Sequence, residues 1–139
     1  MTESMTVPAQ IAEFPRVSEF IENQAQQAGL DPKEITQLLI AAEEAYVNIA
    51  HYAYADAAPG QAEIYCEALS DGTGIAVSFR DNGQPFNPLA NSEPDINAPL
   101  QEREIGGLGI FMIKKMMDDV SYCYQDGKNQ LTLVKKKKA

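Results

Sequence analysis

Positive charge is scarce in this chain of 139 residues. Only 11 Lys and Arg stand against 20 Asp and Glu, and the formal net charge is −9. Nucleic-acid backbones require a cationic surface, so we expect no direct contact with DNA or RNA. The exception is the run Lys135-Lys136-Lys137-Lys138, whose charge suits RNA or a membrane. We interpret it instead as a solvated, fraying terminus.

Long apolar runs and cysteines are also few. No run approaches the roughly 20 apolar residues of a membrane span. The start Met1-Thr2-Glu3-Ser4 lacks the basic and apolar regions of a signal peptide. The only cysteines, Cys66 and Cys123, lie in alternating apolar segments at a spacing that matches no zinc motif. We therefore expect a cytoplasmic protein without a membrane segment, in which both cysteines are buried, reduced thiols.

Hydrophobic periodicity predicts one domain over residues 1–139. Helical spacing runs from Val17 to Ala28, and a second helix is predicted from Asp31 to about Tyr54. That second helix begins with a capping-box pattern, Asp31-Pro32-Lys33-Glu34. A third helix is predicted over 109–118, and strands over 4–8, 62–69, 74–80, 120–124 and 130–134.

The order β-α-α-β-β-α-β-β contains two hairpins. It predicts an α+β two-layer sandwich, with a mixed, mostly antiparallel sheet and helices on one face. Residues 87–105 hold three prolines and show no clean period. A structureless loop of this length inside a domain is usually functional, often a lid.

Glu44 and Asn48 form the first candidate functional pair. They are four residues apart on the second predicted helix, so they share a face, and neither falls on its apolar stripe. A carboxylate and a carboxamide side by side can hold Mg²⁺ and position or deprotonate a nucleophile. A solvated helix face is the alternative interpretation.

The segment Asp81-Asn82-Gly83 directly follows a predicted strand. An Asp at a strand end can accept a hydrogen bond from an exocyclic amine such as that of adenine. Gly83 would let the ring approach the backbone. The alternative is a plain turn that leaves the sheet.

A glycine-rich segment, Gly106-Gly107-Leu108-Gly109, opens the third predicted helix. Exposed backbone N–H groups and the helix dipole at such a position suit a triphosphate. The pattern is neither a Walker A motif nor a dinucleotide fingerprint, because no Gly-Lys-Ser/Thr follows and no strand immediately precedes it. A flexible hinge is the alternative.

In order and spacing, these motifs resemble the GHKL (histidine-kinase-like) ATPase superfamily, and most closely its anti-sigma-factor serine/threonine kinases. Glu43–Tyr54 is similar to their N box, Asp81–Phe86 to the first glycine box and Gly106–Asp118 to the second. Gly127–Leu133 resembles their closing strand. The similarity extends over nearly the whole chain and implies the Bergerat ATPase fold, with the ATP lid at about 87–105.

The resemblance implies a binding site for ATP and Mg²⁺. Asn48 would be the magnesium ligand, Glu44 the general base, and Asp81 the adenine-binding residue with Gly83 beneath the ring. Thr132 would line the adenine end. The full set implied for nucleotide binding is Asn48, Asp81, Gly83, Gly106, Gly107, Leu108, Gly109, Ile110 and Thr132.

The function implied by the resemblance is that of a protein-serine kinase and anti-sigma regulatory factor. Such a protein transfers the γ-phosphate of ATP to an anti-anti-sigma (STAS-type) partner, sequesters a sigma factor and commonly forms a homodimer. The alternative is an ATP-binding regulatory module that holds a partner without phosphoryl transfer. Glu44 favours the kinase, because binding alone needs no general base.

Overall fold

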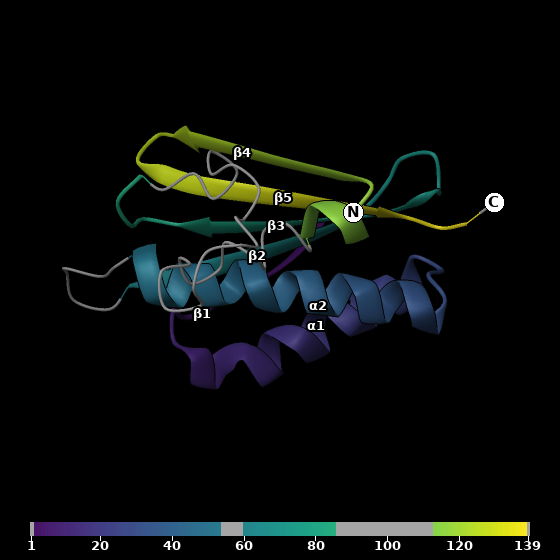
Figure 1. The fold of residues 1–139 in the computed structure, drawn as a ribbon, viewed down its shortest axis with the longest axis horizontal. Coiled ribbons are helices and arrows are strands. Elements are labelled where there is room, and N and C mark those ends of the chain that lie inside the picture. Colours follow the sequence, from purple (N-terminus) through teal and green to yellow (C-terminus); the bar gives the residue numbers. More distant parts are fainter. Residues whose placement is uncertain (1, 54–59, 86–112, 139) are drawn as a thin grey trace, which may run out of the picture.

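A computed structural model describes residues 2–53, 60–85 and 113–138 of the chain. Five strands form one sheet, and the helices lie along one of its faces (Figure 1). A 3₁₀ turn, a π-helical turn and a short helical turn cover Ile11–Glu13, Ile49–Ala53 and residues 113–116. The main elements are β1 (Thr2–Pro8), α1 (Phe14–Gln27), α2 (Pro32–Asn48), β2 (Gln61–Ala68), β3 (Gly74–Asp81), β4 (Asp119–Gln125) and β5 (Lys128–Lys136).

The strands follow the order β1-β2-β3-β5-β4, and every neighbouring pair is antiparallel. The sheet is therefore antiparallel throughout its described strands, where the sequence predicted a mixed but mostly antiparallel one. Both predicted hairpins are present, as β2–β3 and β4–β5. The α+β fold with helices on one face is confirmed.

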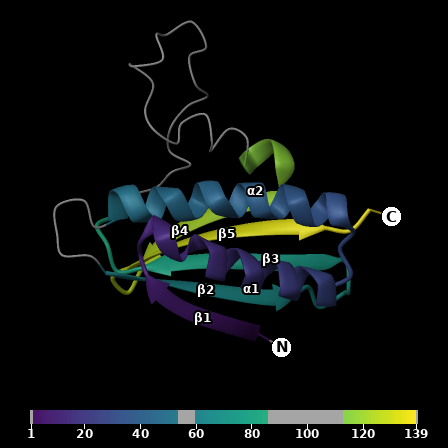
Figure 2. The same ribbon diagram turned by 90° about the horizontal axis from the view of Figure 1, so that it is seen from below.

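The helices and the sheet bury a single core between them (Figure 2). α1 packs over β2 and β3, while α2 packs over β5. Because strand side chains alternate between faces, every second residue of β3 and β5 enters this core. The largest fully buried side chains are Tyr46, Phe79, Ile21, Leu38, Ile64, Ile75, Ile113 and Leu133. We call the opposite side of the sheet the open face.

α2 begins where its capping signal predicted, whereas α1 begins at Phe14, three residues before the predicted start at Val17. At the start of α2, Asp31 Oδ1 accepts from the Glu34 backbone N–H at 2.7 Å, and Glu34 Oε1 accepts from that of Asp31 at 2.9 Å. This confirms the capping box. The α-helical part of α2 ends at Asn48 and continues as the π-helical turn Ile49–Ala53. None of the helices that the structure describes has the length and apolarity needed to cross a bilayer.

The prediction that both cysteines are buried is wrong for one of them. Cys66 is buried in β2, and this burial raises the pKa of its thiol to about 12. Cys123 is exposed. It pairs with Gln130 across β4 and β5 and lies on the open face, whereas its neighbour Tyr122 pairs with Leu131 on the helix side.

The interpretation of the lysine run as a frayed terminus is wrong, because Lys135 and Lys136 belong to β5 and the backbone N–H groups of Lys137 and Lys138 donate hydrogen bonds. Lys135 lies in β5, where its ammonium group donates to Gln37 Oε1 and to the Met116 carbonyl, both at 2.7 Å. Further along, the Lys138 backbone N–H donates to Glu34 Oε2 at 2.6 Å. The end of the described chain is therefore tied to the start of α2.

Tyr46 ties α2 to the segment that follows β1. Its side chain is fully buried, and its ring packs against Phe14 at a centroid distance of 5.7 Å. Its hydroxyl shares its one hydrogen between the Gln10 carbonyl at 2.7 Å and the Pro8 carbonyl at 2.9 Å. The same two carbonyls also accept from the backbone N–H groups of Gln10 and Glu13, and the added hydrogen bond of a buried hydroxyl stabilises the fold.

Removing the Tyr46 hydroxyl should therefore destabilise the chain without disturbing its packing. We expect Tyr46→Phe to lower the free energy of unfolding by about 1–2 kcal/mol, measured by urea denaturation. The matched control is Tyr124→Phe, because Tyr124 is 45% exposed; it should change stability by less than about 0.5 kcal/mol. Equal effects of the two substitutions would contradict this account of Tyr46.

Candidate functional site

The site lies where one helix and two strands end or begin, on one side of the molecule. The C-terminal end of α2, the end of β3 and the start of β5 all lie there, on the left of Figure 1. They carry Asn48, Asp81 and Asn129, which are only 4–6% exposed. Glu34, the other buried polar or charged residue of the described chain, is used in the capping box. Since burying polar groups costs free energy, their concentration at one place indicates a functional site.

Asp81 is held by two donors through one of its oxygens. Oδ1 accepts from the Gly83 backbone N–H at 2.8 Å and from Asn129 Nδ2 at 3.0 Å. Burial raises the pKa of this carboxyl, and the two hydrogen bonds oppose that shift. Oδ2 takes no part in either contact, so it is the atom that this arrangement leaves for a ligand.

Asn129 is a site residue that the sequence reasoning missed. It is the cross-strand partner of Asp81, and its Nδ2 also donates to the Gln84 carbonyl at 2.8 Å. Its Oδ1 accepts from the hydroxyl of Tyr122. The signal was available, because alternation with Leu131 and Leu133 places Asn129 on the core side of its strand.

Asn48 was expected outside the apolar stripe of its helix, and this expectation is wrong. The buried positions Leu38, Ala41, Ala45 and Asn48 follow one another at three- and four-residue spacing, so Asn48 ends a buried row. Its Nδ2 donates to the Glu44 backbone carbonyl at 3.0 Å. The contact does not use the amide oxygen, the atom through which an asparagine binds hard cations.

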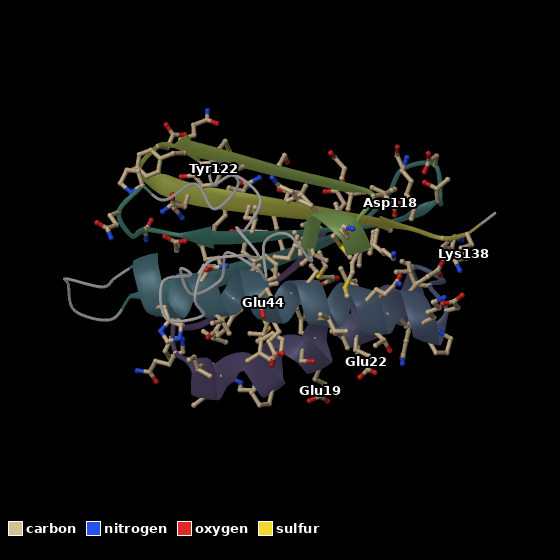
Figure 3. The ribbon with its side chains drawn as sticks, in the orientation of Figure 1. Glu19, Glu22, Glu44, Asp118, Tyr122 and Lys138 are labelled. Carbon is tan, nitrogen blue, oxygen red and sulfur yellow. The ribbon has the colours of Figure 1, made fainter. Side chains whose placement is uncertain are left out.

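Glu44 lies one turn before Asn48 and is half-buried. Figure 3 labels it on the α2 ribbon. Burial raises the pKa of its carboxyl, and the nearby charge of Glu43 raises it further. A carboxylate whose pKa is moved toward neutrality is a better proton acceptor than an exposed one.

The amide oxygen of Asn48 could hold a magnesium ion that is shared with a nucleotide. Among the described residues no group of three or more His, Cys, Asp or Glu forms a metal cluster. Mg²⁺ at nucleotide sites commonly takes only one or two protein oxygens and completes its shell with phosphates and water. A single amide oxygen at the end of α2 therefore has the right chemistry for such a shared ion.

The structure does not bring Thr132 together with Asp81. Thr132 lies on the open face, where its hydroxyl is 2.9 Å from that of Ser78, its cross-strand partner. Asp81 and Gly83 lie together at the end of β3. The other predicted nucleotide-binding residues and the lid at 87–105 lie outside the described residues: Gly106, Gly107, Leu108, Gly109 and Ile110.

A cavity of about 340 Å³ lies elsewhere, by the β4–β5 turn. It is formed by side chains of the open face and of the turn, and Arg80 in its wall contacts the ring of Tyr65 at 4.4 Å. It shares no residue with the site at the end of α2. Its lining residues are Arg80, Cys123, Gln125, Asp126, Lys128 and Gln130.

Comparisons with known proteins agree with the motifs. Residues 7–135 match the family described as the histidine kinase-like ATPase domain. Serine-protein kinase RsbW of Listeria monocytogenes serovar 1/2a is 33% identical over 107 residues, which cover 74% of this chain and 67% of the relative. Serine-protein kinase RsbW of Bacillus mycoides is 28% identical over 127 residues, which cover 88% and 78%. Serine/threonine-protein kinase BtrW of Bordetella bronchiseptica is 29% identical over 96 residues, which cover 69% and 66%.

A solved structure shows the same fold. A crystal structure of the RsbU and RsbW domains of a Mycobacterium tuberculosis protein superposes with a TM-score of 0.68 at 18% identity. The similarity covers 98% of this chain and 32% of that one. This structure confirms the fold, and the family match and sequence relatives confirm the predicted resemblance to the anti-sigma-factor kinases.

The charge on the buried Asp81 carboxylate should lower the free energy of unfolding of the chain when no nucleotide is bound. Because the folded-state pKa is raised, this carboxyl favours folding below the ordinary Asp pKa of about 3.9, and the benefit is lost as pH rises through the raised value. Asp81→Asn keeps an acceptor for both donors and removes the charge. We expect it to be as stable as the wild type or more stable in urea at neutral pH.

The advantage of Asp81→Asn should shrink as the pH is lowered, because the wild-type carboxyl then becomes neutral as well. Denaturation curves of both proteins across the acidic range measure this difference. A clear loss of stability in the variant at neutral pH would contradict the conclusion that burial dominates at Asp81.

Proposed function

Because the chain belongs to the histidine kinase-like ATPase domain family, we propose that it is an Mg·ATP-dependent protein-serine kinase and anti-sigma regulatory factor. The observation that carries the proposal is the placement of Asp81 and Asn48, two buried polar side chains, at one end of the molecule, with the half-buried Glu44 one turn away. Relatives named serine-protein kinases support the reaction type.

At the base end of the nucleotide, Asp81 Oδ2 accepts a hydrogen from the exocyclic amine of adenine. Gly83, whose N–H is bound to Asp81 Oδ1 at 2.8 Å, lies beneath the ring. A hydrogen bond to a buried carboxylate is worth more than one in water, so this contact contributes both affinity and base selectivity.

At the phosphate end, the amide oxygen of Asn48 would hold Mg²⁺, which would neutralise charge on the phosphates. Gly106, Gly107, Leu108, Gly109 and Ile110 supply backbone N–H groups to the phosphate oxygens. Glu44 orients the attacking serine hydroxyl and accepts its proton. Catalysis thus depends mainly on positioning and charge neutralisation.

The protein substrate that we propose is a serine of an anti-anti-sigma (STAS-type) protein. The same chain would sequester a sigma factor as a cytoplasmic homodimer and so regulate transcription, without direct contact with nucleic acid. Kinase relatives of the RsbW type support this assignment. The net charge of −9 is consistent with protein partners rather than nucleic acid.

The second candidate function is an ATP-binding module that holds a partner without transferring phosphate. Incubation with γ-labelled ATP and a candidate anti-anti-sigma protein separates the two. Label on a serine of the partner supports the kinase. Label that stays on bound nucleotide, with the partner nevertheless retained, supports the binding module.

The role of Glu44 is tested by Glu44→Gln. We expect nucleotide affinity within about threefold of wild type and a transfer rate lower by about 100-fold or more, because the base is lost but the shape is kept. The matched control is Glu22→Gln, since Glu22 is an exposed glutamate on α1 that takes no part in the site. Transfer by Glu44→Gln at the wild-type rate would refute the assignment.

The raised pKa of Glu44 adds a pH dependence to this prediction. A general base works only when deprotonated, so the wild-type transfer rate should rise with pH through that raised pKa and then level off. The residual rate of Glu44→Gln should lack this rise. Single-turnover rates across the acidic and neutral range measure both profiles.

The role of Asn48 is tested by Asn48→Ala. We expect affinity for Mg·ATP to fall by about tenfold or more, while affinity for the nucleotide with Mg²⁺ chelated changes little, because only the metal ligand is removed. Calorimetric titrations with and without a chelator measure the two values. Equal losses under both conditions would contradict the metal assignment.

A further inference from the structure

We propose that Tyr122 and Asn129 form an amide lock that positions Asp81 and thereby sets the preference of the site for the 6-amino group of adenine. The inference rests on the proposed function, because it deepens the role of Asp81 as the base-binding residue. Tyr122 lies outside the motifs of the sequence analysis, and Asn129 lies in the segment Gly127–Leu133 but was given no role there. Figure 3 shows Tyr122 on β4, the edge strand of the sheet beside β5.

The Asn129 amide is held between acceptors on one side and a donor on the other. Nδ2 lies 3.0 Å from Asp81 Oδ1, 2.8 Å from the Gln84 carbonyl and 3.5 Å from the Gly83 carbonyl. Oδ1 receives the hydroxyl hydrogen of Tyr122. A rotated amide would turn its oxygen toward the carboxylate and the two carbonyls, so one orientation satisfies all of these groups.

This orientation controls two features that a base would meet. The first is the carboxylate of Asp81, whose Oδ1 is fixed by Asn129 and by the Gly83 N–H so that Oδ2 keeps a constant direction. The second is the turn at Gly83 and Gln84, whose carbonyls bind the same amide nitrogen. Asn129 therefore links the hydrogen-bond acceptor for the base to the backbone beneath the base.

Cross-strand geometry explains why these residues can act together. Asn129 of β5 is opposite Asp81 of β3. Tyr122 of β4 is opposite Leu131 of β5, so its side chain lies on the helix side of the sheet. The Tyr122 hydroxyl thus reaches Asn129 along the same face. A side chain that is only 5% exposed, as Asn129 is, keeps its rotamer because its neighbours leave no other.

A positioning role differs measurably from a purely structural one. Loss of structure weakens binding of every nucleotide, whereas loss of Asp81 positioning weakens only the contact with the 6-amino group. Purine riboside 5′-triphosphate lacks that amine and is otherwise the same as ATP. The ratio of its Kd to that of ATP therefore isolates the hydrogen bond to Asp81.

The experiment measures both Kd values by calorimetry on the full chain with Mg²⁺, for wild type, Asn129→Ala and Tyr122→Phe. We expect the wild type to prefer ATP by about tenfold or more, as for a hydrogen bond to a charged acceptor. Both variants should lower this preference to about threefold or less and bind the purine analogue nearly as wild type does. Tyr124→Phe on the same strand and Gln130→Ala on the open face should keep the wild-type ratio.

Each outcome decides a separate point. A wild type that binds ATP and the analogue equally would overturn the base-binding role of Asp81, and with it the proposed site. A selective wild type together with selective variants would overturn the amide lock alone. If Asn129→Ala fails to fold by circular dichroism, Tyr122→Phe decides, because it removes one oxygen and keeps the ring; unchanged selectivity there would overturn the lock.

Discussion

The hydrogen bond between Asn129 Nδ2 and Asp81 Oδ1, at 3.0 Å, is the contact on which this end of the molecule depends. It joins two side chains that are nearly inaccessible to water, and it forms because the antiparallel register of β3 and β5 places them opposite each other. A buried carboxylate without partners would be costly, so the asparagine and the Gly83 N–H make the charge tolerable. The remaining carboxylate oxygen can then serve a ligand.

The two faces of the sheet have different chemistry. On the helix face, apolar side chains continue until Asp81 and Asn129, where the core ends in polar groups. On the open face, polar side chains pair across strands, as Glu63 does with Lys128 at 2.6 Å. Because strand residues alternate between these faces, a shift of one residue along a strand decides whether a side chain belongs to the site.

This alternation explains what the sequence could and could not predict. The first two helices, the hairpins and the capping box followed from periodicity and local signals, and Asp81 followed from its place at a strand end. Of the third predicted helix, 109–118, the described residues are helical only over 113–116. Thr132 was chosen from a resemblance in the closing strand. It lies three residues after Asn129, the residue that contacts Asp81, and therefore on the opposite face of β5. Asn48 is buried by tertiary packing around α2. The apolar stripe expected from the sequence did not include it, because asparagine is polar. Cys123 is exposed because it lies on the open face of β4, an edge strand of the sheet.

The central claim is that the nucleotide binds on the helix face, at the end of α2, β3 and β5. Titration of the ¹⁵N-labelled chain with Mg·ATP, followed by NMR, tests it most directly. The account predicts the largest shifts at the Gly83 backbone amide and the Asn129 side-chain amide, with Thr132 little changed. The largest shifts at Arg80, Cys123 and Gln130, around the open-face cavity, would contradict it.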